Sequence, residues 1–150
     1  MEEPKTAGVR RVRDGERAPL VLLVDDLQEA RDMYATSLTC AGLRVIEATD
    51  GEHGLLKVTT LMPDVVVMDL AMPGVLDGWE AIRQLKTRPR TRDIAIVALT
   101  GHSSEHDLRR AEDAGADVVL AKPCAPDMLL SVIERLLDQR YGVRPDATAK

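Results

Sequence analysis

Five short apolar runs alternate along the chain with five segments in which apolar residues recur at helical spacing. The runs cover residues 20–24, 43–48, 65–69, 94–99 and 118–121. The helical segments cover about residues 28–41, 51–60, 77–87, 104–114 and 125–138. Strands and helices that alternate with short links form parallel sheets with helices on both faces. The alternation therefore predicts one doubly wound α/β domain.

The third run, VVVMD, ends in a carboxylate, Asp69. Its uninterrupted apolar residues are typical of a strand buried on both faces. A carboxylate at the end of such a strand either caps the following turn or lines a site at the edge of the sheet. The run alone leaves both interpretations open.

Composition limits the class of protein. No apolar segment approaches the roughly 18 residues that span a bilayer, and the N-terminal residues contain no apolar stretch typical of a signal peptide. We therefore expect no membrane insertion. Cys40 and Cys124 form neither a metal-type pair nor a disulfide framework, which favours a cytoplasmic protein.

Charge argues against non-specific nucleic-acid binding. The chain has 25 acidic and 20 basic side chains and a net charge of −5. The basic clusters at 10–13 and 88–92 are short and lack interleaved aromatic residues, so we interpret them as solvated surface. Residues 1–18 and 140–150 show no periodicity and are expected to be disordered tails around a domain at 19–139.

Polar side chains stand at the carboxyl ends of the first, third, fourth and fifth predicted strands: Asp25 and Asp26, Asp69, Thr100 and Lys122. Ligands of open parallel sheets bind at this edge. Three neighbouring carboxylates need a cation, and oxygen ligands suit Mg²⁺. A carboxylate can also act as a nucleophile toward phosphorus, with Lys122 and Thr100 contacting phosphoryl oxygens.

Each of these residues also has an ordinary structural interpretation. Asp25 and Asp26 could cap a helix, Thr100 could belong to a turn, and Lys122 could be solvated. Their joint occurrence at the ends of four of the five predicted strands favours a site for phosphoryl transfer.

The same residues resemble the receiver domain of bacterial two-component response regulators. The matching motifs are VDD at 24–26, MDLAMPG at 68–74 followed by DG at 77–78, LTG at 99–101, AGAD at 114–117 and KP at 122–123. The resemblance covers about residues 19–139. It implies the flavodoxin-like (βα)5 fold, with a parallel five-stranded sheet of order 2-1-3-4-5.

The resemblance further implies that Asp69 accepts a phosphoryl group from a sensor histidine kinase or a histidine phosphotransfer protein. Asp26 and Asp69 would bind Mg²⁺ through their side chains and Ala71 through its backbone carbonyl. Asp25 would act through a bound water.

The remaining implied roles concern the phosphoryl group and the switch. Lys122 would contact the phosphoryl group, and Thr100 would move toward it. The bond between Lys122 and Pro123 would be a cis peptide.

Two features depart from the family. Three residues, at 74–76, stand between Met-Pro and Asp-Gly, where two are usual. Val119 occupies a switch position that is often aromatic, and it is too small and too stiff at χ1 to swing between rotamers. We therefore expect switching to depend on Thr100, with weaker coupling to the last strand.

Three rival functions account for parts of the same pattern. Haloacid dehalogenase-type phosphatases need a second Asp where Ala71 stands, so we expect no enzyme beyond self-phosphorylation and slow self-dephosphorylation. A flavodoxin-like cofactor site would need a phosphate-cradling loop where Asp25 and Asp26 stand. A receiver-like interaction module that is not phosphorylated remains the alternative.

Few residues follow the last predicted helix, so little sequence is left to encode a DNA-binding or enzymatic output domain. We expect a stand-alone regulator that acts by binding an unknown downstream protein or by phosphorelay, without direct contact to nucleic acid. Whether it forms a homodimer stays open.

Overall fold

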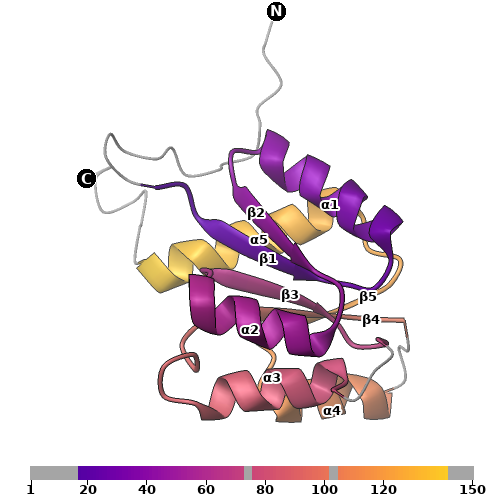
Figure 1. Ribbon diagram of the computed structural model, residues 1–150. Coiled ribbons are helices and arrows are strands. Elements are labelled where there is room, and N and C mark those ends of the chain that lie inside the picture. Colours follow the sequence, from indigo (N-terminus) through magenta and orange to yellow (C-terminus); the bar gives the residue numbers. More distant parts are fainter. Residues whose placement is uncertain (1–16, 73–75, 102–104, 142–150) are drawn as a thin grey trace, which may run out of the picture.

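The computed structural model describes residues 17–72, 76–101 and 105–141, in which five strands alternate with five helices (Figure 1). The strands are β1 Leu20–Val24, β2 Arg44–Ala48, β3 Val65–Asp69, β4 Ala95–Thr100 and β5 Val118–Ala121. The helices are α1 Gln28–Cys40, α2 Gly51–Leu61, α3 Gly78–Thr87, α4 Glu105–Ala114 and α5 Pro126–Tyr141. No helix in these ranges is both long and apolar enough to cross a bilayer.

All neighbouring strands run parallel, in the order β2-β1-β3-β4-β5. This confirms the predicted flavodoxin-like fold. The register pairs Asp69 with Leu99 and Thr100 with Ala121. The polar strand ends therefore emerge along one edge of the sheet, the edge at which sites form in this kind of fold.

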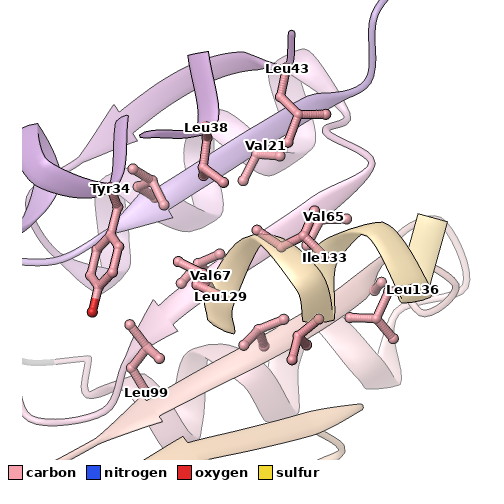
Figure 2. Packing of buried hydrophobic residues seen from close by; sticks show 14 of the residues in the cluster. Val21, Tyr34, Leu38, Leu43, Val65, Val67, Leu99, Leu129, Ile133 and Leu136 are labelled. Atoms are coloured by element: carbon pink, nitrogen blue, oxygen red, sulfur yellow. The ribbon is translucent and has the colours of Figure 1, made fainter. Parts of the chain in front are cut away.

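Alternate side chains of the strands enter two separate cores. Val65 and Val67 pack on the face covered by α1 and α5, where Figure 2 shows part of the cluster. Val66 and Met68 pack on the face covered by α2, α3 and α4. Successive residues of a strand point to opposite faces, so the uninterrupted apolar run of β3 follows from burial on both sides.

Helix α5 continues two residues past the boundary expected at 139. Arg140, in its last turn, donates from Nη1 to the backbone carbonyls of Asp64, at 3.2 Å, and Asp93, at 3.0 Å. These bonds tie the end of the helix to the amino-terminal side of the sheet. The rest of the expected tails, at 1–16 and 142–150, lies outside the described residues.

Candidate functional site

Three carboxylates meet at the carboxyl edge of β1 and β3. Asp25 and Asp26 follow β1 directly, and Asp69 is the last residue of the neighbouring strand β3. One oxygen from each lies within 4.8 Å of the others. Asp25 and Asp69 are buried, whereas Asp26 is exposed. Two carboxylates of the cluster are therefore buried at the edge of the sheet, and the third is accessible to solvent.

Lys122 brings a positive charge to these carboxylates. It directly follows β5, and its Nζ lies 3.2 Å from Asp69 Oδ1 and 3.6 Å from Asp25 Oδ2. One ammonium group offsets only part of the charge of three carboxylates. The site thus keeps a net negative charge that would attract a further cation.

Asp25 has one carboxylate oxygen that pairs with the Lys122 charge at 3.6 Å but accepts no hydrogen bond among the described residues. Its Oδ1 accepts a hydrogen bond from the Leu27 N–H at 2.9 Å, but its buried Oδ2 accepts none from the described residues. Burial raises the pKa of Asp25, and repulsion from Asp69 raises it further, against the Leu27 hydrogen bond and the charge of Lys122. An all-oxygen set with an unsatisfied buried carboxylate oxygen fits Mg²⁺.

Asp69 is held in place by backbone on both sides. Its Oδ1 accepts a hydrogen bond from the Ala71 N–H at 3.1 Å, and the next residue, Leu70, donates to the Leu99 carbonyl at 2.9 Å. A Cβ on Gly78 would lie 2.5 Å from the Asp69 carbonyl oxygen. Only glycine allows α3 to begin this close to the end of β3, so Asp69 is packed firmly from that side.

The expected switch residues lie on the last two strands. Thr100 is buried at the end of β4, and its carbonyl accepts the Lys122 N–H at 2.7 Å. Val119 pairs with Ala98 and lies half-buried against the core under α2, α3 and α4. The bond between Lys122 and Pro123 is cis.

The loop with the additional residue is described only in part, because residues 73–75 lie outside the described ranges. Leu76 packs against the start of α2, where a Cβ on Gly51 would lie 2.6 Å from the Leu76 carbonyl oxygen. Glycine at this position lets the loop lie directly on the helix.

Two residues of α1 that the sequence did not single out also contact the site. Arg31 donates from Nη1 to the Asp25 carbonyl at 2.8 Å, and the Tyr34 hydroxyl donates to the Cys124 carbonyl at 2.8 Å. Only Tyr34 gives a sequence signal for such a contact. It is a tyrosine on the apolar face of its helix, and a buried tyrosine hydroxyl usually finds a hydrogen-bond partner. Nothing in the sequence identifies a partner 90 residues away.

Known proteins resemble this chain in sequence and in fold. The family model described as the response regulator receiver domain matches residues 21–134. The KDP operon transcriptional regulatory protein KdpE of Escherichia coli is 40 % identical over 103 residues, which cover 69 % of this chain and 44 % of KdpE. This chain spans about half the length of most of the curated relatives that it matches, and 15 % of the gliding motility regulatory protein of Myxococcus xanthus.

Solved structures agree with the sequence matches. The chemotaxis protein CheY4 of Vibrio cholerae superposes with a TM-score of 0.74 at 31 % identity, over 79 % of this chain and 98 % of that one. The BeF3-activated DrrB receiver domain superposes with a TM-score of 0.71 at 30 % identity, over 81 % and 98 % of the two chains.

Proposed function

Because this chain belongs to the family of response regulator receiver domains, we propose that Asp69 accepts a phosphoryl group in two-component signalling. The donor is a phosphohistidine on a sensor histidine kinase or a histidine phosphotransfer protein. The observation that carries the proposal is the position of Asp69, buried at the end of a central strand with the Lys122 ammonium group 3.2 Å from its Oδ1.

In the proposed step, a carboxylate oxygen of Asp69 attacks the phosphorus atom. The O–P bond forms as the N–P bond breaks, and the imidazole leaves with the electron pair of that bond. Lys122 pairs with a phosphoryl oxygen and offsets its charge. The rigid backbone around Asp69 keeps the nucleophile in position while the donor approaches.

The site would hold Mg²⁺ through the side chains of Asp26 and Asp69, the backbone carbonyl of Ala71 and, through water, Asp25. When bound, the ion would neutralise charge on the phosphoryl oxygens. The unsatisfied Oδ2 of Asp25 and the net negative charge of the cluster support this assignment.

Signalling would then depend on Thr100 moving toward the phosphoryl group, with only weak coupling to Val119. Crystal structures with and without beryllofluoride test this part. Rearrangement around Val119 without movement of Thr100 would contradict it.

We further propose a cytoplasmic bacterial regulator that is not an enzyme beyond self-phosphorylation and slow self-dephosphorylation. It would act by partner binding or phosphorelay.

Intact mass after incubation with acetyl phosphate tests the function. We expect a phosphoryl adduct that requires Mg²⁺ and is absent from Asp69→Asn. If the wild type forms no adduct and binds no beryllofluoride with Mg²⁺, the unphosphorylated interaction module replaces this proposal.

A further inference from the structure

Two side chains of helix α1, Arg31 and Tyr34, contact the chain segments that carry the candidate site. Both bind backbone carbonyls and not the clustered carboxylates. Arg31 donates to the carbonyl of Asp25, and Tyr34 donates to the carbonyl of Cys124. The two side chains stand three residues apart, on neighbouring positions of the helix surface. Helix α1 thereby links the segment after β1 with the segment after β5, which are not neighbours in the sheet.

The side chain of Tyr34 is held firmly in the core. Its side chain belongs to the core beneath α1 and α5 and is 5 % exposed. Figure 2 shows its ring extending from α1 with the hydroxyl oxygen at the far end. Burial raises the pKa of Tyr34, so the hydroxyl stays protonated and donates at neutral pH.

The segment that Tyr34 contacts is the one that carries Lys122. The Lys122 N–H binds the Thr100 carbonyl of β4, and two residues later the Cys124 carbonyl binds Tyr34. The segment is therefore fixed at both ends. The lysine side chain is long and flexible, so the position of its backbone decides whether its ammonium group reaches Asp69.

We propose that Tyr34 is a positioning residue for Lys122, because its hydroxyl fixes the Cys124 carbonyl and so places the Lys122 ammonium group against Asp69. The role rests on the proposed phosphoacceptor function. It makes Tyr34 necessary for full affinity toward a phosphoryl group but not toward the metal ion, since the Asp25 and Asp69 carboxylates are held by the Leu27 and Ala71 N–H groups.

The variant Tyr34→Phe keeps the ring and removes only the hydroxyl. Thr91→Val is its matched control, because the buried Thr91 hydroxyl donates to the Leu85 carbonyl at 2.6 Å on the opposite side of the sheet. Both variants lose one buried hydroxyl-to-carbonyl bond, and thermal unfolding should report a similar loss of stability.

Calorimetric titration separates positioning from stability. At saturating Mg²⁺, the Kd for beryllofluoride should rise about fivefold in Tyr34→Phe, because binding must then fix a segment that the hydrogen bond already holds in the free wild type. It should stay at the wild-type value in Thr91→Val. The Kd for Mg²⁺ alone should match the wild type in both variants.

A double-mutant cycle with Lys122→Met tests the route through Lys122. Its readout is the rate constant of adduct formation with acetyl phosphate, followed by intact mass. Tyr34→Phe should slow the wild type but have no further effect on Lys122→Met. Equal slowing in both backgrounds would overturn the inference.

The outcomes distinguish this inference from the function on which it rests. A wild type that neither binds beryllofluoride nor forms an adduct would overturn both. A wild type that does both, with Tyr34→Phe unchanged from it, would overturn the role of Tyr34 alone.

Discussion

The ammonium nitrogen of Lys122 lies 3.2 Å from Asp69 Oδ1, although β4 separates their strands in the sheet. The same nitrogen lies 3.6 Å from Asp25 Oδ2. A single cation thus joins two buried carboxylates that would otherwise repel each other. In the proposed phosphoryl transfer, the charge of this cation offsets that of the incoming group.

Replacing Lys122 with Met should separate metal binding from phosphoryl binding. Loss of a positive charge beside the carboxylates should leave Mg²⁺ affinity equal or higher, whereas beryllofluoride affinity should fall at least about tenfold. Without Mg²⁺, the free energy of unfolding should fall by about 1–2 kcal/mol, because the lysine is partly exposed. Titration calorimetry and urea unfolding measure these changes.

Lys86→Met is the matched control for that variant. Lys86 Nζ pairs with Asp117 Oδ2 at 2.8 Å and also donates to the Ile94 carbonyl. This variant should lose stability but keep the wild-type affinities for both ligands. Weaker Mg²⁺ binding in Lys122→Met than in Lys86→Met would contradict the electrostatic account of the site.

Gly78→Ala should damage the site through the backbone of β3. The new Cβ would lie 2.5 Å from the Asp69 carbonyl oxygen and 2.7 Å from Leu70 Cα, and neither atom can move without shifting the strand end. We expect a loss of about 2 kcal/mol in the free energy of unfolding and weaker Mg²⁺ binding. Gly101→Ala, where a Cβ meets nothing within 4 Å, should change neither. Equal effects would refute the packing argument.

Asp25→Asn should change stability in opposite directions with and without Mg²⁺. In the metal-free protein, it removes a buried charge whose pKa burial raises, while the amide oxygen can still accept the Leu27 N–H. The free energy of unfolding should therefore rise by about 1 kcal/mol. With Mg²⁺ at about a hundred times its Kd, the wild type should gain about 2.7 kcal/mol, and the variant should gain much less. Thermal unfolding with Mg²⁺ or with EDTA measures both changes in stability. An Asp25→Asn variant less stable than the wild type in EDTA would contradict the argument that the buried charge of Asp25 destabilises the metal-free protein.

The order of helices and strands followed from apolar periodicity, and the polar strand ends followed from their position after each run. Asp69 illustrates why, since a carboxylate after four apolar residues of a central strand has few places to lie except the edge of the sheet. The strand order came from the resemblance of the motifs to a family, because periodicity does not specify which strands are neighbours.

Contacts between distant residues could not be predicted in the same way. The bond from Tyr34 to the Cys124 carbonyl depends on how closely α1 packs beside the segment after β5, which no local pattern encodes. The extension of α5 to Tyr141 likewise depends on Arg140 reaching the carbonyls of Asp64 and Asp93. Val118 to Leu120 form a half-buried strand because β5 is at the edge of the sheet.

Glu134 should make stability depend on pH. The Oε1 atom of Glu134 is buried and has no hydrogen-bond partner among the described residues. Burial, and to a smaller extent repulsion from Asp138, raises the pKa of Glu134 above 4.5. The folded state therefore binds the proton more tightly than the unfolded state, and this group's contribution to stability falls as pH rises above 4.5 toward its folded pKa.

Glu134→Gln removes that titration. Its free energy of unfolding should equal that of the wild type near pH 4 and exceed it at about pH 7.5, by no more than about 1 kcal/mol because of solvent screening. Glu112→Gln, which changes an exposed glutamate on α4, should show no such pH-dependent difference. Urea unfolding at the two pH values measures these free energies. A larger difference between Glu134→Gln and the wild type at the lower pH would contradict the predicted direction of the pH dependence.

The central claim is that Asp69 is the residue that becomes phosphorylated, and borohydride reduction of the phosphorylated protein tests it most directly. An acyl phosphate on aspartate is reduced to homoserine, which peptide mass spectrometry can locate. Conversion should occur at Asp69, only after treatment with acetyl phosphate and Mg²⁺. Homoserine at Asp25 or Asp26, with Asp69 unchanged, would contradict the account.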